Sequence, residues 1–294
     1  MRFTRADAGL KDAPIWSLPV PGNPVQHAVM EPILQTKLSF APWADPRTAR
    51  LPGVIPFELD DWLEVDTAYG AQMALRDHLI ATTPEEVIAL DDSARPAALE
   101  LLDMLLGLLP GLGFVVTQTE ITRPDGITVP MDRDRPMHTM GRLLQCDICL
   151  MQPDPSGATQ ESVLTGGVLC FPSGWRLPEK FMKPMLRIHQ PIEAYTADLA
   201  ARVQRMMNGV QVGRGLMRGT ASRSDAHLCD PRSEGDYRHG TRESRYIRVE
   251  RQSLVRLPET RAVVFTIHTQ VVLPEALTSD QAAALDARPI RLAD

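Results

Sequence analysis

Two apolar, β-branched segments near the C-terminus, residues 246–257 and 262–273, constrain the fold most strongly. The second contains VVFTIHTQVVL, and β-branched side chains fit the pleated surface of a sheet. The residues between them, Leu257-Pro258-Glu259-Thr260, are typical of a turn. The two segments therefore predict a β-hairpin. Further strands are expected at 114–116, 143–151 and 167–171.

Helices are expected mainly in the first part of the chain. Asp60 or Asp61 can cap a helix that runs to about Thr82. Three more helices are expected: one starting at Thr83-Pro84-Glu85-Glu86, one over 97–109 that Pro110-Gly111 closes, and one over 192–207. Helices first and antiparallel strands later indicate the α+β fold class.

We expect a single domain over residues 1–294, made of four parts. Residues 1–60 are rich in proline and weakly periodic, which predicts an extended arm that wraps the body. The other parts are a helical part at 61–113, a sheet-containing part at 114–273 and a tail at 274–294. Within the sheet-containing part, residues 209–240 are polar and rich in Gly, Arg and Ser, which predicts a long loop.

Composition and charge narrow the classes of partner. The net charge of −6 argues against a nucleic-acid partner, because nucleic-acid binders usually present a basic face. The same charge gives no support for binding at an anionic membrane. Four cysteines in 294 residues are too few for a disulfide scaffold, and the N-terminus lacks an apolar stretch of signal-peptide length. The expected location is the reducing cytoplasm.

Several cofactor motifs are missing from the sequence. No GxGxxG motif follows an expected strand, and no GxxxxGK[ST] loop is found, so a Rossmann site for NAD(P)H is not expected. Any reducing power must then come from another protein or domain. Cys146 and Cys149 form a CxxC pair, but residues i and i+3 of a strand face opposite sides of a sheet. We therefore favour small apolar strand residues over a zinc site. Leu150 follows where a covalent c-type haem site would have His.

Two long strings stand out from the rest of the chain. The first is CFPSGWRLPEK at 170–180, followed by LRIHQPI at 186–192. The second is RVERQSLVRLP at 248–258, followed by VFTIHT at 264–269. Together they resemble the haem-dependent oxidative N-demethylase family, α-subunit type. The resemblance extends over roughly residues 32–273.

This resemblance implies a fold, an activity and partners. Family members hold a b-type haem in a PAS-like antiparallel sheet, here the part at 114–273 with its flanking helices. They use O2 to oxidise a small secondary amine such as dimethylamine to the primary amine and formaldehyde. Electrons come from NADPH through a separate flavoprotein reductase. A partner similar to aminomethyltransferases passes formaldehyde to tetrahydrofolate.

The resemblance also assigns the iron ligand. The His of the IH-x-P string is the axial ligand in the family, which corresponds to His189 here. A neutral imidazole suits iron, and its other ring nitrogen should donate to a carbonyl or carboxylate. Pro191 restricts the backbone of the preceding residue and helps to fix this short segment. Without the family strings, a lone buried histidine would be the better interpretation.

Other residues of the strings are candidates for contacts with haem or substrate. Because guanidinium matches carboxylate, haem propionates could pair with basic side chains. The candidates are Arg176, Lys180, Arg248 and Arg251 for the propionates, Phe171 and Trp175 for packing on the macrocycle, and Asp147 and Glu179 as catalytic acids. The alternatives for each are a solvated strand face, a core aromatic residue or a surface acid.

Departures from the family pattern leave a second function open. Cys146 replaces a usual acid, and His268 stands where the family has Arg. The stretch Arg214-Gly-Leu-Met217 lacks the usual Asn and Trp. The alternative function is therefore a non-enzymatic, PAS-like haem-binding sensor or interaction subunit, which amine-dependent oxygen consumption would distinguish from an enzyme. A cysteine-ligated zinc protein is a third alternative, which metal analysis would distinguish.

Overall fold

The predicted hairpin lies in the middle of a large antiparallel sheet in the computed structural model, which describes residues 32–49, 53–190, 196–225, 228–234, 236 and 244–290. Strands β9 (Tyr246–Arg256) and β10 (Val263–Val272) pair along their whole length, with Val263 opposite Arg256. The sheet has seven strands in the order β1-β8-β9-β10-β6-β7-β2, and all of its pairings are antiparallel. The prediction of mixed helices and strands around an antiparallel sheet is confirmed.

The other strands of this sheet come from widely separated parts of the chain. They are β1 (Ile55–Glu58), β2 (Ile88–Leu90), β6 (Asp147–Pro153), β7 (Ser162–Val168) and β8 (Arg214–Ser224). A small second sheet consists of β3 (Val115–Val116), β4 (Glu120–Thr122) and β5 (Thr128–Pro130). The strands expected at 114–116, 143–151 and 167–171 are therefore present, but with shifted bounds.

The long loop predicted at 209–240 is wrong for its first half, because β8 is an eleven-residue strand between β1 and β9. Its glycines allow close packing and do not mark a turn. A side chain at Gly215 would meet the ring of Phe57, and one at Gly219 would meet the ring of Phe40. Glycine in a strand often marks such a close approach.

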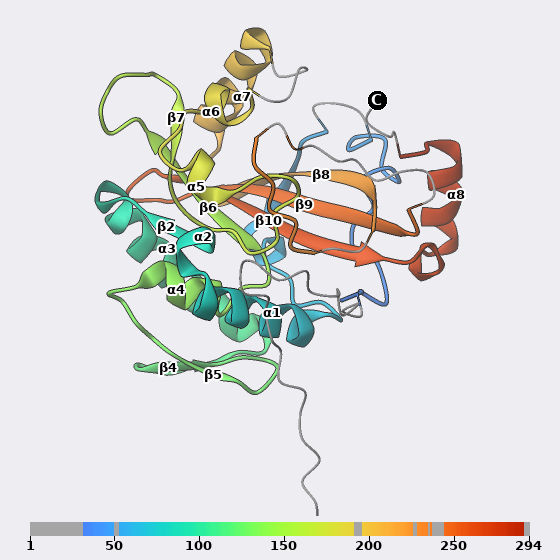
Figure 1. The fold of residues 1–294 in the computed structure, drawn as a ribbon, viewed down its shortest axis with the longest axis horizontal. Coiled ribbons are helices and arrows are strands. Elements are labelled where there is room, and N and C mark those ends of the chain that lie inside the picture. Colours follow the sequence, from blue (N-terminus) through green and yellow to red (C-terminus); the bar gives the residue numbers. More distant parts are fainter. Residues whose placement is uncertain are drawn as a thin grey trace, which may run out of the picture. The chain divides into compact units, whose positions relative to one another are not determined.

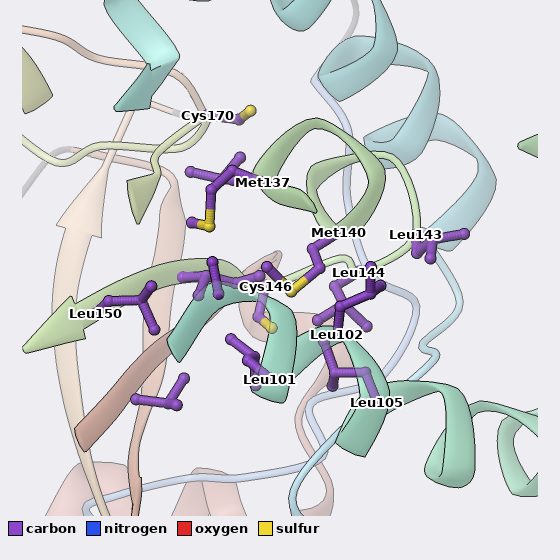
Figure 2. Close-up of a cluster of buried hydrophobic side chains, with 14 of the residues drawn as sticks. Leu101, Leu102, Leu105, Met137, Met140, Leu143, Leu144, Cys146, Leu150 and Cys170 are labelled. Carbon is purple, nitrogen blue, oxygen red and sulfur yellow. The ribbon is translucent and has the colours of Figure 1, made fainter. Parts of the chain in front are cut away.

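Helices α1 (Tyr69–Thr82), α3 (Arg95–Leu108) and α4 (Pro136–Gly141) lie on one side of the sheet, and α6 and α7 lie away from them (Figure 1). Leucines of α3 pack with methionines of α4 and with β6 in the main core (Figure 2). Leu102 and Met140, for example, are fully buried. This core fixes one face of the sheet, so the other face is available for a site.

The first helix begins later than predicted. A short 3₁₀ turn, η1 (Leu59–Asp61), replaces its start, and α1 begins only at Tyr69. The reason is that the sheet holds the intervening chain: Trp62 Nε1 donates to Thr266 Oγ1 at 3.1 Å, and Asp66 Oδ2 lies 3.0 Å from His268 Nε2. Tertiary contacts thus override a local helix signal.

The remaining helices are short, apart from α7 and α8. They are α2 (Pro84–Val87), α5 (Leu177–Lys180), α6 (Met185–Ile188), α7 (Ala197–Gly209) and α8 (Ser279–Ala287), with 3₁₀ turns η2 (Asp92–Ala94), η3 (Leu109–Leu112) and η4 (Pro274–Ala276). The helix predicted from residue 192 begins at Ala197, after the Thr196 cap, and residues 192–195 lie outside the described part. The tail forms α8, which Thr278 and Gln281 cap reciprocally.

Part of the predicted arm packs on the sheet. Gln35 exchanges two hydrogen bonds with the backbone of Val271, of 3.0 Å and 2.7 Å, and Trp43 Nε1 donates to the carbonyl of Gln281 at 2.9 Å. Residues 1–31 lie outside the described residues, so the arm and the single-domain division stay predictions. None of the helices in the described ranges is long and apolar enough to cross a membrane.

Candidate functional site

A cavity of about 360 Å³ lies between one face of the sheet and the segments that carry α5, α6 and α7. Alternation along the strands places apolar side chains on this face, because residues i and i+2 of a strand point the same way. Cys149 of β6, Phe265 of β10 and Leu254 of β9 lie opposite one another in one row across the sheet. Val203 and Met207 of α7 cover the cavity from the other side. Its size is typical of ligand pockets, which span roughly 300–1,000 Å³.

His189 borders this cavity directly after α6. Its Nδ1 lies 2.9 Å from the carbonyl oxygen of Met185. A carbonyl only accepts, so Nδ1 donates, and in the neutral ring Nε2 then has the lone pair that ligates metals. Burial lowers the pKa of His189, which favours that neutral form. The predicted hydrogen bond to a carbonyl is thus observed, while Pro191 lies outside the described residues.

Two cationic side chains also border the cavity, and they differ in their partners. Lys180 of α5 forms an ion pair with Glu234, which in turn binds Arg187 at 2.9 Å. Arg218 of β8 lies opposite Gln252 of β9, and its Nε is buried without a hydrogen-bond partner among the described residues. Burial lowers the pKa of Arg218 despite the charge of Glu250 nearby. Lys180 therefore forms an ion pair, whereas Arg218 forms none among the described residues.

The polar wall of the cavity comes from β9. Glu250 and Gln252 both border it, and Gln252 Nε2 donates to Glu250 Oε2 at 3.1 Å. Arg248 Nε also donates to Glu250, at 3.2 Å. Glu250 is the one carboxylate among the described residues that border the cavity.

Sequence reasoning missed three of these polar residues, Arg218, Glu250 and Gln252. Glu250 and Gln252 lie within the RVERQSLVRLP string, and period-2 alternation from Leu254, which points into the cavity, would have placed both on the same face. Arg218 gave no such signal, because its segment was expected to be a loop.

Of the predicted cofactor contacts, Trp175 and Lys180 border the cavity, and four others do not. Arg176 pairs with Glu86 at 2.7 Å on a partly exposed surface. Phe171 is buried beneath the guanidinium of Arg76, whose carbon lies 5.2 Å from the ring centroid. These positions favour the structural alternatives for Arg176 and Phe171.

Arg248 and Arg251 of β9 also have backbone partners outside the cavity. Arg248 donates to the carbonyl oxygens of Phe171 at 2.7 Å and Leu228 at 3.0 Å. Arg251 donates to the carbonyl oxygens of Asp61 and Trp62, and its guanidinium carbon lies 5.7 Å from the ring centroid of Phe57. Their proposed pairing with propionates has no support from these contacts.

The two predicted catalytic acids lie outside the cavity lining. Asp147 is fully buried, pairs with Arg76 at 2.6 Å and accepts from the backbone N–H groups of Cys170 at 2.8 Å and Phe171 at 3.0 Å. Glu179 accepts from the backbone N–H of Glu234 at 3.1 Å. Both positions are those of structural carboxylates, and a catalytic role for either stays a prediction.

The cysteine pair behaves as the strand geometry predicts. Cys146 packs in the main core, whereas Cys149 packs in the cluster beside the cavity. Burial raises the pKa of Cys146 to about 12 and that of Cys149 further, so both stay protonated thiols. Metal ligation by cysteine requires thiolates, so these surroundings favour the apolar interpretation.

His268 lies apart from His189, among polar side chains beneath α1. Its Nε2 lies 3.0 Å from Asp66 Oδ2, and Gln145 Nε2 donates to Asp66 Oδ1 at 2.6 Å. Burial alone would raise the pKa of Asp66, but the bonds from His268 and Gln145 hold it well below its ordinary value. His268 is thus a hydrogen-bond partner of a buried carboxylate and does not border the cavity.

Comparison with protein families identifies the family of this chain. The family model described as haem-dependent oxidative N-demethylase, alpha subunit-like, matches residues 53–290. No curated protein matches the sequence. The matched range contains the whole sheet and each described residue that borders the cavity. The chain therefore belongs to the haem-dependent oxidative N-demethylase alpha subunit-like family.

Proposed function

We propose that this chain is a haem-dependent monooxygenase subunit that removes a methyl group from a small secondary amine similar to dimethylamine. The products are the primary amine and formaldehyde. The observation that carries the proposal is His189, which borders an apolar cavity with Nδ1 hydrogen-bonded to a carbonyl and Nε2 as the basic nitrogen. A single histidine would be sufficient to hold haem iron, because the macrocycle would supply the remaining nitrogen ligands.

The cavity residues fit a haem. Leu254, Phe265 and Trp175 offer apolar surfaces for a macrocycle, and the Nε of Arg218, which has no acceptor among the described residues, offers a donor for an acidic substituent. His189 would hold the iron, and without a CxxCH string the haem would be b-type and not covalently attached. Bound haem supplies the oxidising chemistry that uses O2 to hydroxylate the methyl carbon.

The chain itself orients the ligand and the substrate. The Met185 carbonyl fixes the tautomer and the ring orientation of His189. Glu250 gives the cavity a carboxylate that can accept a hydrogen bond from an alkylammonium cation, while its ion pair with Arg248 and the hydrogen bond from Gln252 hold it in place. The apolar walls limit the water around His189 and Glu250, which strengthens the charge interactions of Glu250.

The proposed partners follow from the family and from missing motifs. Electrons would come from NADPH through a separate flavoprotein, because the chain has no Rossmann fingerprint. An aminomethyltransferase-like subunit would accept formaldehyde.

Two further proposals concern the fold and the location. The PAS-like assignment is supported by the strand order β7-β6-β10-β9-β8, with α5 to α7 between β7 and β8. The proposed cytoplasmic location is supported by four unpaired cysteines.

Formaldehyde formation tests this function. We expect haem-loaded protein with NADPH and dimethylamine to produce no formaldehyde and to oxidise no NADPH. Adding a flavoprotein reductase should start formaldehyde release in proportion to the amine, and a mixture without amine is the control. NADPH turnover by the chain alone would contradict the need for a reductase. Reduced haem that yields no formaldehyde would favour the sensor alternative.

A further inference from the structure

Arg218 is a basic residue of the cavity wall that lies outside the two family strings and was not among the predicted propionate partners. It belongs to β8, opposite Gln252 of β9, and borders the same cavity as His189. A cation is therefore built into the wall of the cavity that the proposed iron ligand also borders.

The partners of Arg218 are incomplete within the protein. Its Nε is buried and has no hydrogen-bond acceptor among the described residues, and no described carboxylate forms an ion pair with it. The nearby Glu250 already accepts from Arg248 and Gln252. Lys180, by contrast, forms an ion pair with Glu234. Arg218 thus differs from Lys180 in having no ion-pair partner among the described residues.

A half-buried guanidinium whose Nε has no acceptor among the described residues is costly, so a ligand that supplies an anion at this place would be favoured. The planar guanidinium presents paired N–H donors that match the two oxygens of a carboxylate. The apolar walls around it would strengthen that bond, because charges interact more strongly in a low dielectric.

We propose that Arg218 is the carboxylate-binding residue of the cavity. The proposal rests on the proposed function, because the carboxylate belongs to one of two ligands of the same site. One source is a propionate of haem. The other is a substrate that carries a carboxylate beside its methylated nitrogen, such as an N-methyl amino acid.

The first arm of the test compares haemin with haemin dimethyl ester, which has no free propionate. The haem-free full chain should bind haemin about tenfold more tightly than the ester, since a hydrogen bond to a charged group has roughly this effect. Arg218→Gln should remove the difference, and Arg218→Lys should keep part of it. Arg214→Gln changes an exposed arginine at the start of the same strand and should keep all of it.

The second arm compares N-methylglycine with its methyl ester by calorimetry, with and without haem in the protein. A preference for the acid that Arg218→Gln abolishes would assign the carboxylate to the substrate. If Arg218→Gln changes neither preference while its thermal unfolding matches wild type, the proposal is overturned. Failure of the wild-type chain to take up any haemin would instead contradict the proposed function, and the second arm without haem would still decide the role of Arg218.

Discussion

Replacing His189 with alanine is expected to lower haem affinity by more than about tenfold. Removing only a supporting partner of a metal ligand already costs roughly 10–100-fold in metal affinity, and loss of the ligand itself should cost more. The measurement is haemin titration followed by absorption, with the reduced and oxidised spectra of each variant. Added imidazole should restore the wild-type spectrum to a His189→Gly variant, because it can occupy the space of the deleted ring.

The matched control is His268→Ala. His268 is a buried histidine of this chain, whereas His189 is half-buried, and His268 binds Asp66 and does not border the cavity. We expect this variant to keep its haem and its spectrum. Loss of haem from the His268 variant together with retention by the His189 variant would show that the ligand is assigned to the wrong histidine.

Replacing Asp147 with asparagine is expected to lower the free energy of unfolding by roughly 3–5 kcal/mol, the usual cost of breaking a buried ion pair. The side chains of Asp147 and Arg76 are both fully buried, and their pair has an N–O distance of 2.6 Å. Asparagine leaves the Arg76 charge without its counterion in an apolar core. Urea unfolding of the two proteins measures the difference.

Asp103→Asn is the control for this change. Asp103 and Arg133 form a pair with the same 2.6 Å distance, but both side chains are about half exposed. Exposed pairs contribute less than about 1 kcal/mol, so unfolding should change little. Unchanged stability of the Asp147 variant, with haem retained and demethylation lost, would restore the catalytic interpretation of Asp147.

The sequence predicted those parts of the fold whose local pattern agrees with their tertiary surroundings. The β9–β10 hairpin is an example, because its β-branched residues and its turn indicate the same structure. β8 could not be predicted, since a strand between β1 and β9 needs little intrinsic preference when both neighbours pair with it. The start of α1 was misplaced because Trp62 and Asp66 are held by strand residues about 200 positions later in the chain.

The same physical distinction applies to the site. His189 was selected because it lies in a specific string, and the structure adds that it borders the cavity with Nδ1 beside the carbonyl of Met185. Arg176, Arg248 and Arg251 are of the residue type that binds propionates. Their partners, however, are carbonyls and carboxylates of the protein itself. Such pairings depend on the packing of distant segments, so residue type alone could not separate them from Arg218.

The central claim is that this cavity binds haem b through His189. The most direct measurement is the absorption spectrum of the purified chain, as isolated and after addition of haemin, with and without reductant. We expect a Soret band that shifts on reduction and a pigment that acid–acetone extracts, because no CxxCH string can hold it covalently. A colourless protein that takes up no added haemin would contradict the claim.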